Sequence, residues 1–274
     1  MPKLAVLGQP ISHSRSPAIH NAALEAMGLA GEWSYEAIEV SPEEFEARVR
    51  AMPGQRFRGA NVTIPHKLAA LAIAGTASDA AGEIGAANTL TFAEGAIAAD
   101  NTDAPGLIAA LPRPPGGDRA LVLGAGGAAR AVVWALVRAG AEVAIWNRTG
   151  QKAKELATAM GASVADPDAD TGLLSAGDFD LIVNATSIGL EGADASLDEH
   201  LKALHLDADS IEQRHVVVDL AYGPSETPLI AASARRGASV VDGLEVLVHQ
   251  GAASLRLWTG QEPPVDVMRR AARR

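Results

Sequence analysis

Cysteine is absent from the 274-residue sequence, and aromatic residues make up only 4% of it. Without cysteine there can be no disulfide bond, no thiolate metal site and no cysteine nucleophile. Basic residues are also in the minority, because 33 Asp and Glu outnumber 23 Lys and Arg and give a formal net charge of −10. A surface of this charge repels nucleic acid and anionic membranes, so an anionic ligand must be held by a local site. We therefore expect no nucleic-acid partner and no membrane partner.

Long hydrophobic runs are missing as well. The most apolar helical stretch, residues 131–137, lies between Arg130 and Arg138 and is far shorter than the roughly 20 residues of a spanning helix. The first ten residues, MPKLAVLGQP, predict a first strand rather than a signal peptide, and a cytoplasmic protein is expected. His13 and His20 have no carboxylate between them, so no metal site is expected.

Helix and strand signals alternate along the first hundred residues, which is typical of an α/β fold. The pattern predicts strands at 3–8, 33–40 and 59–64, helices at 17–28, 41–52, 66–73 and 77–84, and a hairpin of strands at 88–92 and 96–99. The turn-rich segment PRPPGGD (112–118) has no periodicity and is interpreted as a linker or exposed connection.

The second half predicts a doubly wound sheet. Residues 119–149 have the pattern of a strand, a glycine turn, a helix and a strand, and residues 180–185 and 215–220 are short apolar runs typical of buried parallel strands. Residues 191–200 are expected to form an acidic, weakly structured loop, and helices are expected at 244–258 and 263–274. We expect two α/β domains, with the C-terminal helices returning to the first.

The glycine turn has the features of a dinucleotide-binding loop. Gly124 allows the tight bend after the strand, Gly126 lets a pyrophosphate approach the backbone, and Ala129 permits close packing of helix on strand. The N-terminus of the following helix offers unpaired N–H groups to the phosphates. A tight packing turn without a ligand is the structural alternative. The predicted cofactor-binding residues in this turn are Gly124, Ala125, Gly126, Gly127 and Ala128.

The tip of the next strand indicates which dinucleotide is bound. An acidic residue there would accept hydrogen bonds from the ribose of NAD, but the chain has Asn147, Arg148 and Thr149. The Arg148 guanidinium can form a planar fork on a 2′-phosphate, and Lys152 could add a second charge. This pattern favours NADP, although a solvated arginine at a strand end is the alternative.

Several motifs together resemble the shikimate dehydrogenase family, and the resemblance runs nearly from end to end. The stretches that carry it are HSRSP (13–17), NVTIPHK (61–67), IGAANT (84–89), DNTD (100–103), GAGGAAR (124–130), NRT (147–149), NATSIG (184–189), AYGPSETPL (221–229) and DGLEVLVHQG (242–251). Any one of these is a weak signal, whereas the combination is highly specific. The family reduces 3-dehydroshikimate to shikimate with NADPH, a step of aromatic amino-acid biosynthesis.

The resemblance implies that one domain binds the substrate and the other binds the cofactor. It implies a substrate-binding and catalytic domain of residues 1–103, completed by helices at 243–274, and a Rossmann-type NADP-binding domain of residues 104–242. Residues implied to bind substrate are Ser14, Ser16, Thr63, Lys67, Asn88, Asp103, Tyr222 and Gln250. Residues implied to bind cofactor, beyond the glycine turn, are Asn147, Arg148, Thr149, Lys152, Leu220, Gly243 and Asp79.

Lys67 and Asp103 are the expected catalytic pair. Hydride addition to a ketone builds negative charge on oxygen, so a proton donor must stand within about 3 Å of that atom. Lys67 can be the donor, with Asp103 anchoring it and a substrate hydroxyl. The structural alternatives are a solvated lysine at a helix start and an N-cap for a helix near 104–111. Ser14 and Ser16, two positions apart in an extended loop, would point the same way and jointly hold a carboxylate.

The chain departs from the family pattern at Glu245 and Val246, where relatives commonly have Gly and then Met, and this leaves the fine cofactor affinity open. Rival interpretations are a quinate or dual quinate/shikimate dehydrogenase and a non-catalytic NADP-sensing protein on the same fold. The sequence leaves the protonation state of Lys67 and the oligomeric state open, with a homodimer among the options.

Overall fold

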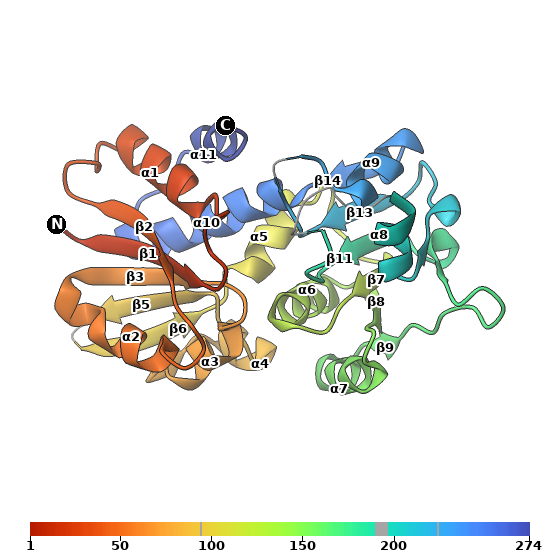
Figure 1. Ribbon diagram of the computed structural model, residues 1–274, viewed down its shortest axis with the longest axis horizontal. Helices are drawn as coiled ribbons and strands as arrows, with labels where there is room; N and C mark the ends of the chain where they lie inside the picture. The colour runs from red at the N-terminus through yellow and green to blue at the C-terminus, as the bar shows by residue number, and fades with distance from the viewer. Residues whose placement is uncertain (94, 190–196, 224) are drawn as a thin grey trace. The chain divides into compact units, whose positions relative to one another are not determined.

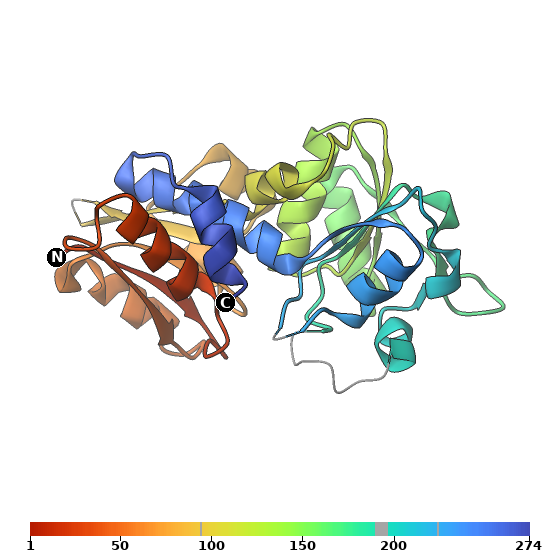
Figure 2. The same ribbon diagram turned by 90° about the horizontal axis from the view of Figure 1, so that it is seen from above.

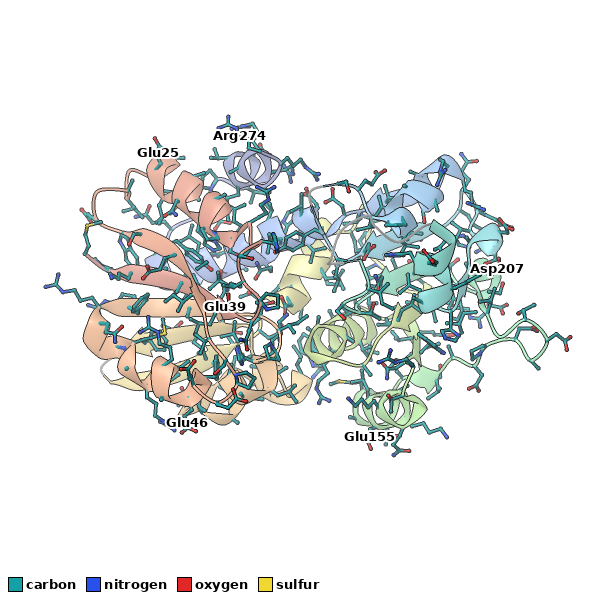
Figure 3. The ribbon with its side chains drawn as sticks, in the orientation of Figure 1. Glu25, Glu39, Glu46, Glu155, Asp207 and Arg274 are labelled. Atoms are coloured by element: carbon teal, nitrogen blue, oxygen red, sulfur yellow. The ribbon has the colours of Figure 1, made fainter. Side chains whose placement is uncertain are left out.

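A computed structural model describes residues 1–93, 95–189, 197–223 and 225–274 (Figure 1). The chain folds as two compact units. Unit 1 comprises residues 1–106 and 247–274, and unit 2 comprises residues 107–246. The sequence placed the change of unit after residue 103 and before residue 243. Acidic side chains such as Glu25 and Glu46 on unit 1 and Glu155 on unit 2 are exposed, as expected for a net charge of −10 (Figure 3).

Unit 1 is built on one mixed six-stranded sheet with the order β2-β1-β3-β5-β6-β4. The three strands β1, β2 and β3 are parallel, and β5 and β6 form an antiparallel hairpin that pairs with β3. The strands are β1 (Lys3–Gly8), β2 (Ser34–Glu39), β3 (Phe57–Val62), β4 (Thr76–Ala77), β5 (Thr89–Ala93) and β6 (Ala96–Asp100).

Alternate residues of β3 face the two sides of this sheet, because successive side chains of a strand point in opposite directions. Ala60 and Val62 join the apolar core beneath α2 (Phe45–Ala51) and α3 (Lys67–Ala72). Gly59 faces the opposite layer, where a Cβ atom would lie 2.0 Å from the Trp258 Nε1. The indole of Trp258 therefore lies against the sheet and donates its N–H to the Leu90 carbonyl at 3.1 Å.

The opposite layer of unit 1 combines the first helix with the end of the chain. Helix α1 (Ser16–Ala26) packs against α11 (Val265–Ala272), and α10 (Gly243–Thr259) carries Trp258 (Figures 1 and 2). The return of the C-terminal helices to the first unit, expected from the sequence, is therefore confirmed. The remaining helices of this unit are the 3-10 turn η1 (Pro53–Gln55) and α4 (Asp79–Ile84), and α5 (Asp103–Ala110) begins at its end.

Unit 2 is a parallel six-stranded sheet with the order β14-β13-β11-β7-β8-β9. The chain starts at β7, winds outward through β8 and β9, and then returns to the other side of β7, which is the doubly wound topology. The strands are β7 (Arg119–Leu123), β8 (Glu142–Trp146), β9 (Ser163–Val164), β11 (Leu181–Asn184), β13 (Val216–Asp219) and β14 (Ser239–Val241). The predicted α/β class with a Rossmann-type second domain is confirmed.

Helices α6 (Gly127–Arg138), α7 (Gly150–Met160) and α9 (Pro228–Arg235) pack against this sheet, and α8 (Leu197–Ala203) packs against α9. A two-stranded ribbon of β10 (Leu174–Ser175) and β12 (Leu206–Asp207) and the short turns η2 (Ala176–Asp178) and η3 (Ala208–Ser210) complete the unit. Within the described residues, no helix has both the length and the apolar character needed to cross a membrane.

The predicted elements differ from the structure at several places, and the strand predicted at 59–64 is observed as β3, which ends at Val62. The helix predicted at 41–52 begins only at Phe45, because residues 42–44 form a turn. The loop predicted at 191–200 ends too late, since α8 starts at Leu197, while residues 190–196 lie outside the described residues. The sequence pattern also did not predict α9 or β14. Short elements of this kind gain their stability from tertiary packing more than from local propensity.

Candidate active site

The polar motifs of unit 1 meet at one edge of its sheet. The parallel strands β1 and β3 both end there, at Gly8 and Val62. Because β5 is antiparallel to β3 and pairs Thr89 with Asn61, β5 begins at the same edge. Strand β6 is antiparallel to β5 and pairs Asp100 with Thr89, so it ends there. The segments that follow or precede these strand ends carry the predicted substrate residues, and the topology therefore gathers motifs far apart in the sequence.

Lys67 and Asp103 form an ion pair at this edge. The Lys67 Nζ donates to the Asp103 Oδ2 at 2.6 Å, and the two side chains are 11% and 18% exposed. Lys67 is the first residue of α3, and Asp103 is the first residue of α5. Because both side chains are largely withdrawn from water, their attraction is stronger than that of a surface pair.

Asp103 does not act as a helix cap, which was the structural alternative for this residue. Both of its carboxylate oxygens are engaged, Oδ2 by Lys67 and Oδ1 by the Asn88 Nδ2 at 2.8 Å. The N–H of Ala104 instead donates to the Asn101 side-chain oxygen at 3.3 Å. The carboxylate is thus held on two sides, in an orientation set by side chains from α3 and from the residue that precedes β5.

Two amide side chains lie beside the ion pair. The Asn88 Nδ2 donates to the Gln250 Oε1 at 3.1 Å, and the Gln250 Nε2 donates to the Leu247 carbonyl at 2.9 Å. Gln250 can come this close because α10 crosses α5 at Gly106, where a Cβ atom would lie 2.7 Å from Gln250. The structure therefore brings together Lys67, Asp103, Asn88 and Gln250, which lie up to 183 positions apart in the sequence.

The two serines of the first motif lie at the start of α1, not in an extended loop. Arg15 between them is helical, with φ −83° and ψ −5°, so the prediction that both side chains project from an extended segment is wrong. The Ser14 Oγ accepts a hydrogen bond from the Ser16 N–H at 3.3 Å, and Ser16 is buried. Thr63 follows β3 and lies against Gly8, where a Cβ atom would approach its methyl group to 2.4 Å.

The glycine turn of unit 2 lies at the centre of its sheet, between β7 and α6. Gly124 has a φ of +115°, and a Cβ atom there would lie 3.0 Å from the Ala185 carbonyl oxygen. Gly126 caps α6 in an extended conformation, and a Cβ atom on it would meet nothing within 4 Å, whereas Ala129 is fully buried. The turn thus combines an open backbone, a helix N-terminus and tight packing, as a dinucleotide site requires.

The tip of β8 presents a cationic surface. The Asn147 Nδ2 donates to the Thr149 carbonyl at 3.0 Å and closes the turn before α7. Arg148 and Lys152 are exposed, and the N–H of Lys152 donates to the Thr149 carbonyl at 3.0 Å. This turn has no acidic side chain from Asn147 to Lys154, which suits a phosphate better than a ribose hydroxyl pair.

A buried acidic residue organises the neighbouring strand ends of unit 2, and the sequence did not single it out. Asp219, at the end of β13, accepts hydrogen bonds from the Thr227 Oγ1 at 2.6 Å, the Asn184 Nδ2 at 2.8 Å and the Ala221 N–H at 3.0 Å. Burial raises the pKa of Asp219 to about 6, although these hydrogen bonds oppose the rise. Its position at the end of an apolar strand, the signal that marked the other polar clusters, could have identified it.

Three further predicted residues lie around this network. Leu220 and Tyr222 belong to the segment that Asp219 holds, and both are half-buried. Gly243 opens α10, where a Cβ atom would lie 2.6 Å from the Leu220 carbonyl oxygen, so only glycine fits. Asp79, in contrast, is an exposed residue at the start of α4 and belongs to unit 1, whereas the other predicted cofactor residues belong to unit 2.

Comparisons with known proteins cover almost the whole chain. Residues 6–90 match the family model "Shikimate dehydrogenase substrate binding domain", residues 115–233 match "Shikimate / quinate 5-dehydrogenase", and residues 243–273 match "Shikimate 5'-dehydrogenase C-terminal domain". The shikimate dehydrogenase (NADP(+)) of Paracoccus denitrificans is 44% identical over 273 residues, covering 97% of this chain and 93% of that protein.

Two solved structures with different enzyme names share this fold. The shikimate 5-dehydrogenase of Thermus thermophilus, in complex with NADP(H) and shikimate, has 42% identity and a TM-score of 0.88, covering 100% of this chain and 99% of that one. A 5-ketofructose reductase of Gluconobacter, at 28% identity, has a TM-score of 0.84 and covers 99% and 97%. The same architecture therefore carries reductases of more than one substrate.

We predict that Asp219 makes the stability of the protein fall as the pH rises from about 4 to about 6. The folded state holds this proton more tightly than the unfolded chain, whose ordinary pKa is 3.8, so stability is lost as the folded carboxyl ionises. A rise of about two units corresponds to about 3 kcal/mol. The free energy of unfolding of the wild-type protein and of Asp219→Asn can be measured with urea at pH 4 and pH 7. The advantage of the wild-type protein over the variant at pH 4 should be smaller at pH 7, or reversed, by about 3 kcal/mol. A pH-independent difference would contradict the assignment.

Proposed function

The chain belongs to the shikimate dehydrogenase family, and we propose on this premise that it catalyses the NADPH-dependent, reversible reduction of 3-dehydroshikimate to shikimate. The observation that carries the proposal is the largely buried pair of Lys67 and Asp103, held against the amides of Asn88 and Gln250. The reaction is a step of aromatic amino-acid biosynthesis. The enzyme is an oxidoreductase acting on a secondary alcohol, and its cofactor is NADP.

Lys67 supplies the proton in this mechanism. When bound, NADPH supplies the hydride that reduces the ketone carbon. The carbonyl oxygen then gains negative charge, and the Lys67 ammonium donates a proton to it and neutralises that charge. In the oxidative direction the same amine, uncharged, accepts the proton of the substrate hydroxyl. Asp103 holds the lysine nitrogen at 2.6 Å, so the donor is oriented before the substrate arrives.

The neighbouring polar groups suit a ring that bears a carboxylate and several hydroxyls. Asn88 and Gln250 offer amide donors and acceptors next to the catalytic pair, and Asp103 can accept a bond from a substrate hydroxyl. Ser14 and Ser16, at the start of α1, and Thr63, which follows β3, supply hydroxyls where the substrate carboxylate would be held. Tyr222, from unit 2, is the remaining substrate contact that we propose.

The residues of unit 2 fit an NADP molecule. The open backbone at Gly126 and the N-terminus of α6 suit a pyrophosphate, and Arg148 and Lys152 suit the 2′-phosphate. The other proposed cofactor contacts of unit 2 are Gly124, Ala125, Gly127, Ala128, Asn147, Thr149, Leu220 and Gly243, and Asp79 of unit 1 is a further proposed contact. The homodimer and the cytoplasmic location expected from the sequence stay predictions.

Quinate is the nearest alternative substrate, since one matched family model names both shikimate and quinate. Quinate carries an extra ring hydroxyl, and Ser16 in place of a bulkier threonine favours shikimate by resemblance. A non-catalytic NADP sensor is less well supported, because it would have no need of the lysine–carboxylate pair.

One assay separates these functions. Purified protein is supplied with shikimate or quinate and with NADP or NAD, and the reduced cofactor is followed by its near-ultraviolet absorbance. We expect turnover with shikimate and NADP, and much slower turnover in the other three combinations. The absence of any turnover with shikimate and NADP, in protein that is folded by circular dichroism, would refute the proposal.

Replacing Lys67 with alanine is expected to lower kcat by a factor of about 100 or more, because general acid catalysis contributes about 10²–10⁴-fold. The KM for shikimate and the melting temperature should change much less. Lys3→Ala is the matched control, since Lys3 is a partly exposed residue of the same unit whose ion pair with Glu36 is 4.0 Å long. Equal losses of turnover, binding and stability in the Lys67 variant would indicate a structural role instead.

Replacing Arg148 with alanine is expected to raise the KM for NADP about 10-fold or more while leaving the KM for NAD nearly unchanged. A hydrogen bond to a charged group contributes about 1.5–3 kcal/mol, and the variant loses the bonds from Arg148 to the 2′-phosphate of NADP. NAD lacks this phosphate, so its binding should not change. Initial rates with each cofactor at saturating shikimate give both constants. Identical changes with NADP and NAD would show that Arg148 does not contact the 2′-phosphate.

A further inference from the structure

A buried line of polar side chains runs through unit 1 behind the candidate active site. It begins at Tyr35, in the outer strand β2, whose hydroxyl donates to the Asn61 Oδ1 at 2.8 Å. The register places Tyr35 opposite Leu4, and Leu4 opposite Gly59 on the far side of β1. Trp258 fills the space left by Gly59, and the phenol reaches Asn61, two residues further along β3.

The orientation of the Asn61 amide follows from its neighbours. Its Nδ2 lies 3.3 Å from the Asn88 carbonyl oxygen and 3.2 Å from the Thr89 Oγ1. A flipped amide would place its oxygen against the Asn88 carbonyl, which is also an acceptor. The Ser254 Oγ lies 3.3 Å from the Asn61 Oδ1, but its one proton has a closer acceptor in the Gly251 carbonyl at 3.0 Å. Tyr35 is therefore the main donor to Asn61.

The Thr89 hydroxyl continues the chain of hydrogen bonds from Asn61 to Asn88. This hydroxyl accepts from Asn61 and lies 3.0 Å from both the Asn88 Oδ1 and the Thr102 Oγ1. The Thr102 hydroxyl is itself 3.2 Å from the Asn88 Oδ1, so either arrangement of the two hydroxyl protons ends on that oxygen. The Thr102 N–H also donates to it at 2.7 Å. With its oxygen held here, Asn88 turns its Nδ2 toward Asp103 and Gln250, and the same nitrogen lies 3.0 Å from the Thr102 Oγ1.

We propose that Tyr35, Asn61 and Thr89 are positioning residues of the enzyme, forming a one-way chain of donors that orients Asn88 and, through it, the Asp103–Lys67 pair. This inference rests on the proposed function, because it assigns these residues a part in the same reaction. The chain runs from the Tyr35 hydroxyl to Asn61, from Asn61 to Thr89, from Thr89 to Asn88 and from Asn88 to the Asp103 Oδ1.

Burial makes this chain sensitive to the loss of one member. Tyr35, Asn61 and Thr89 are 3%, 4% and 0% exposed, so water cannot easily replace a deleted hydroxyl. The Tyr35 ring is held by the imidazole of His20, which stacks on it with centroids 4.0 Å apart. Burial lowers the pKa of His20 to about 4, so its ring is neutral near pH 7 and its Nδ1 donates to the Ser16 carbonyl at 2.8 Å.

The decisive experiment compares Thr89→Val, which removes the hydroxyl at similar volume, with Thr89→Ser, which keeps it. We expect Thr89→Val to lower kcat about 10-fold and to raise the KM for shikimate severalfold, with the KM for NADP unchanged. Thr89→Ser should recover kcat to within about threefold. A structural role alone would lower the melting temperature without this split between the two substrates. Thr259→Val is the control, since the Thr259 hydroxyl bonds the Leu255 carbonyl and the Gln261 N–H, which do not belong to the chain from Tyr35.

Tyr35→Phe tests the same hydrogen-bond chain at the residue where it begins. This variant also replaces Thr89→Val in the test if Thr89→Val does not fold. It should lower kcat about three- to tenfold, and the double variant should lose little more than Thr89→Val alone, because both act through one chain. Unchanged kcat in both folded single variants, or equal impairment of Thr89→Val and Thr89→Ser, would overturn the inference. A wild-type protein inactive with shikimate and NADP would instead overturn the proposed function, so the two failures are distinguishable.

Discussion

The Asp103 carboxylate, held between the Lys67 ammonium and the Asn88 amide, is the interaction on which the geometry of the candidate active site depends. A largely buried charge is stable only when its partners are close and well oriented. One carboxylate oxygen meets the lysine at 2.6 Å and the other meets the amide at 2.8 Å. These two bonds fix the positions of the Lys67 ammonium and the Asn88 amide relative to the carboxylate.

The mixed sheet of unit 1 explains why these partners can meet. Parallel strands alone would bring Lys67 and the serine motif to one edge, but Asn88 and Asp103 flank a hairpin. Because β5 runs antiparallel to β3, the hairpin opens toward the same edge and delivers both residues there. Gly106 then lets α10 come close enough for Gln250 to reach Asn88. Topology and one missing side chain together complete the site.

The two units use buried polar networks in a similar way. In unit 1 the chain from Tyr35 leads to the ion pair of Lys67 and Asp103, and in unit 2 Asp219 joins the ends of β11 and β13. Asp219 bonds Thr227, which caps α9, and the N–H of Ala221, so the segment bearing Leu220 and Tyr222 is tied to the sheet. In both units, residues that do not belong to the proposed ligand contacts orient those that do.

The α/β class, the doubly wound second unit, the NADP preference and the choice of Lys67 and Asp103 as a pair could all be predicted from the amino-acid sequence. These properties depend on local features, such as apolar runs, a glycine turn and the absence of an acid after β8, or on short motifs shared with a family. The cofactor site could be predicted because its motifs lie in one continuous segment, residues 119–149.

The orientation of the side chains, in contrast, was evident only from the folded chain. The helical Arg15 between Ser14 and Ser16, the double engagement of Asp103, the Asp219 network and the chain from Tyr35 were not evident from the sequence. Each depends on contacts whose distances are set by strand register and helix packing. The strength of a hydrogen bond changes when the donor–acceptor distance changes by tenths of an ångström. Sequence patterns specify only which face or strand end a residue occupies.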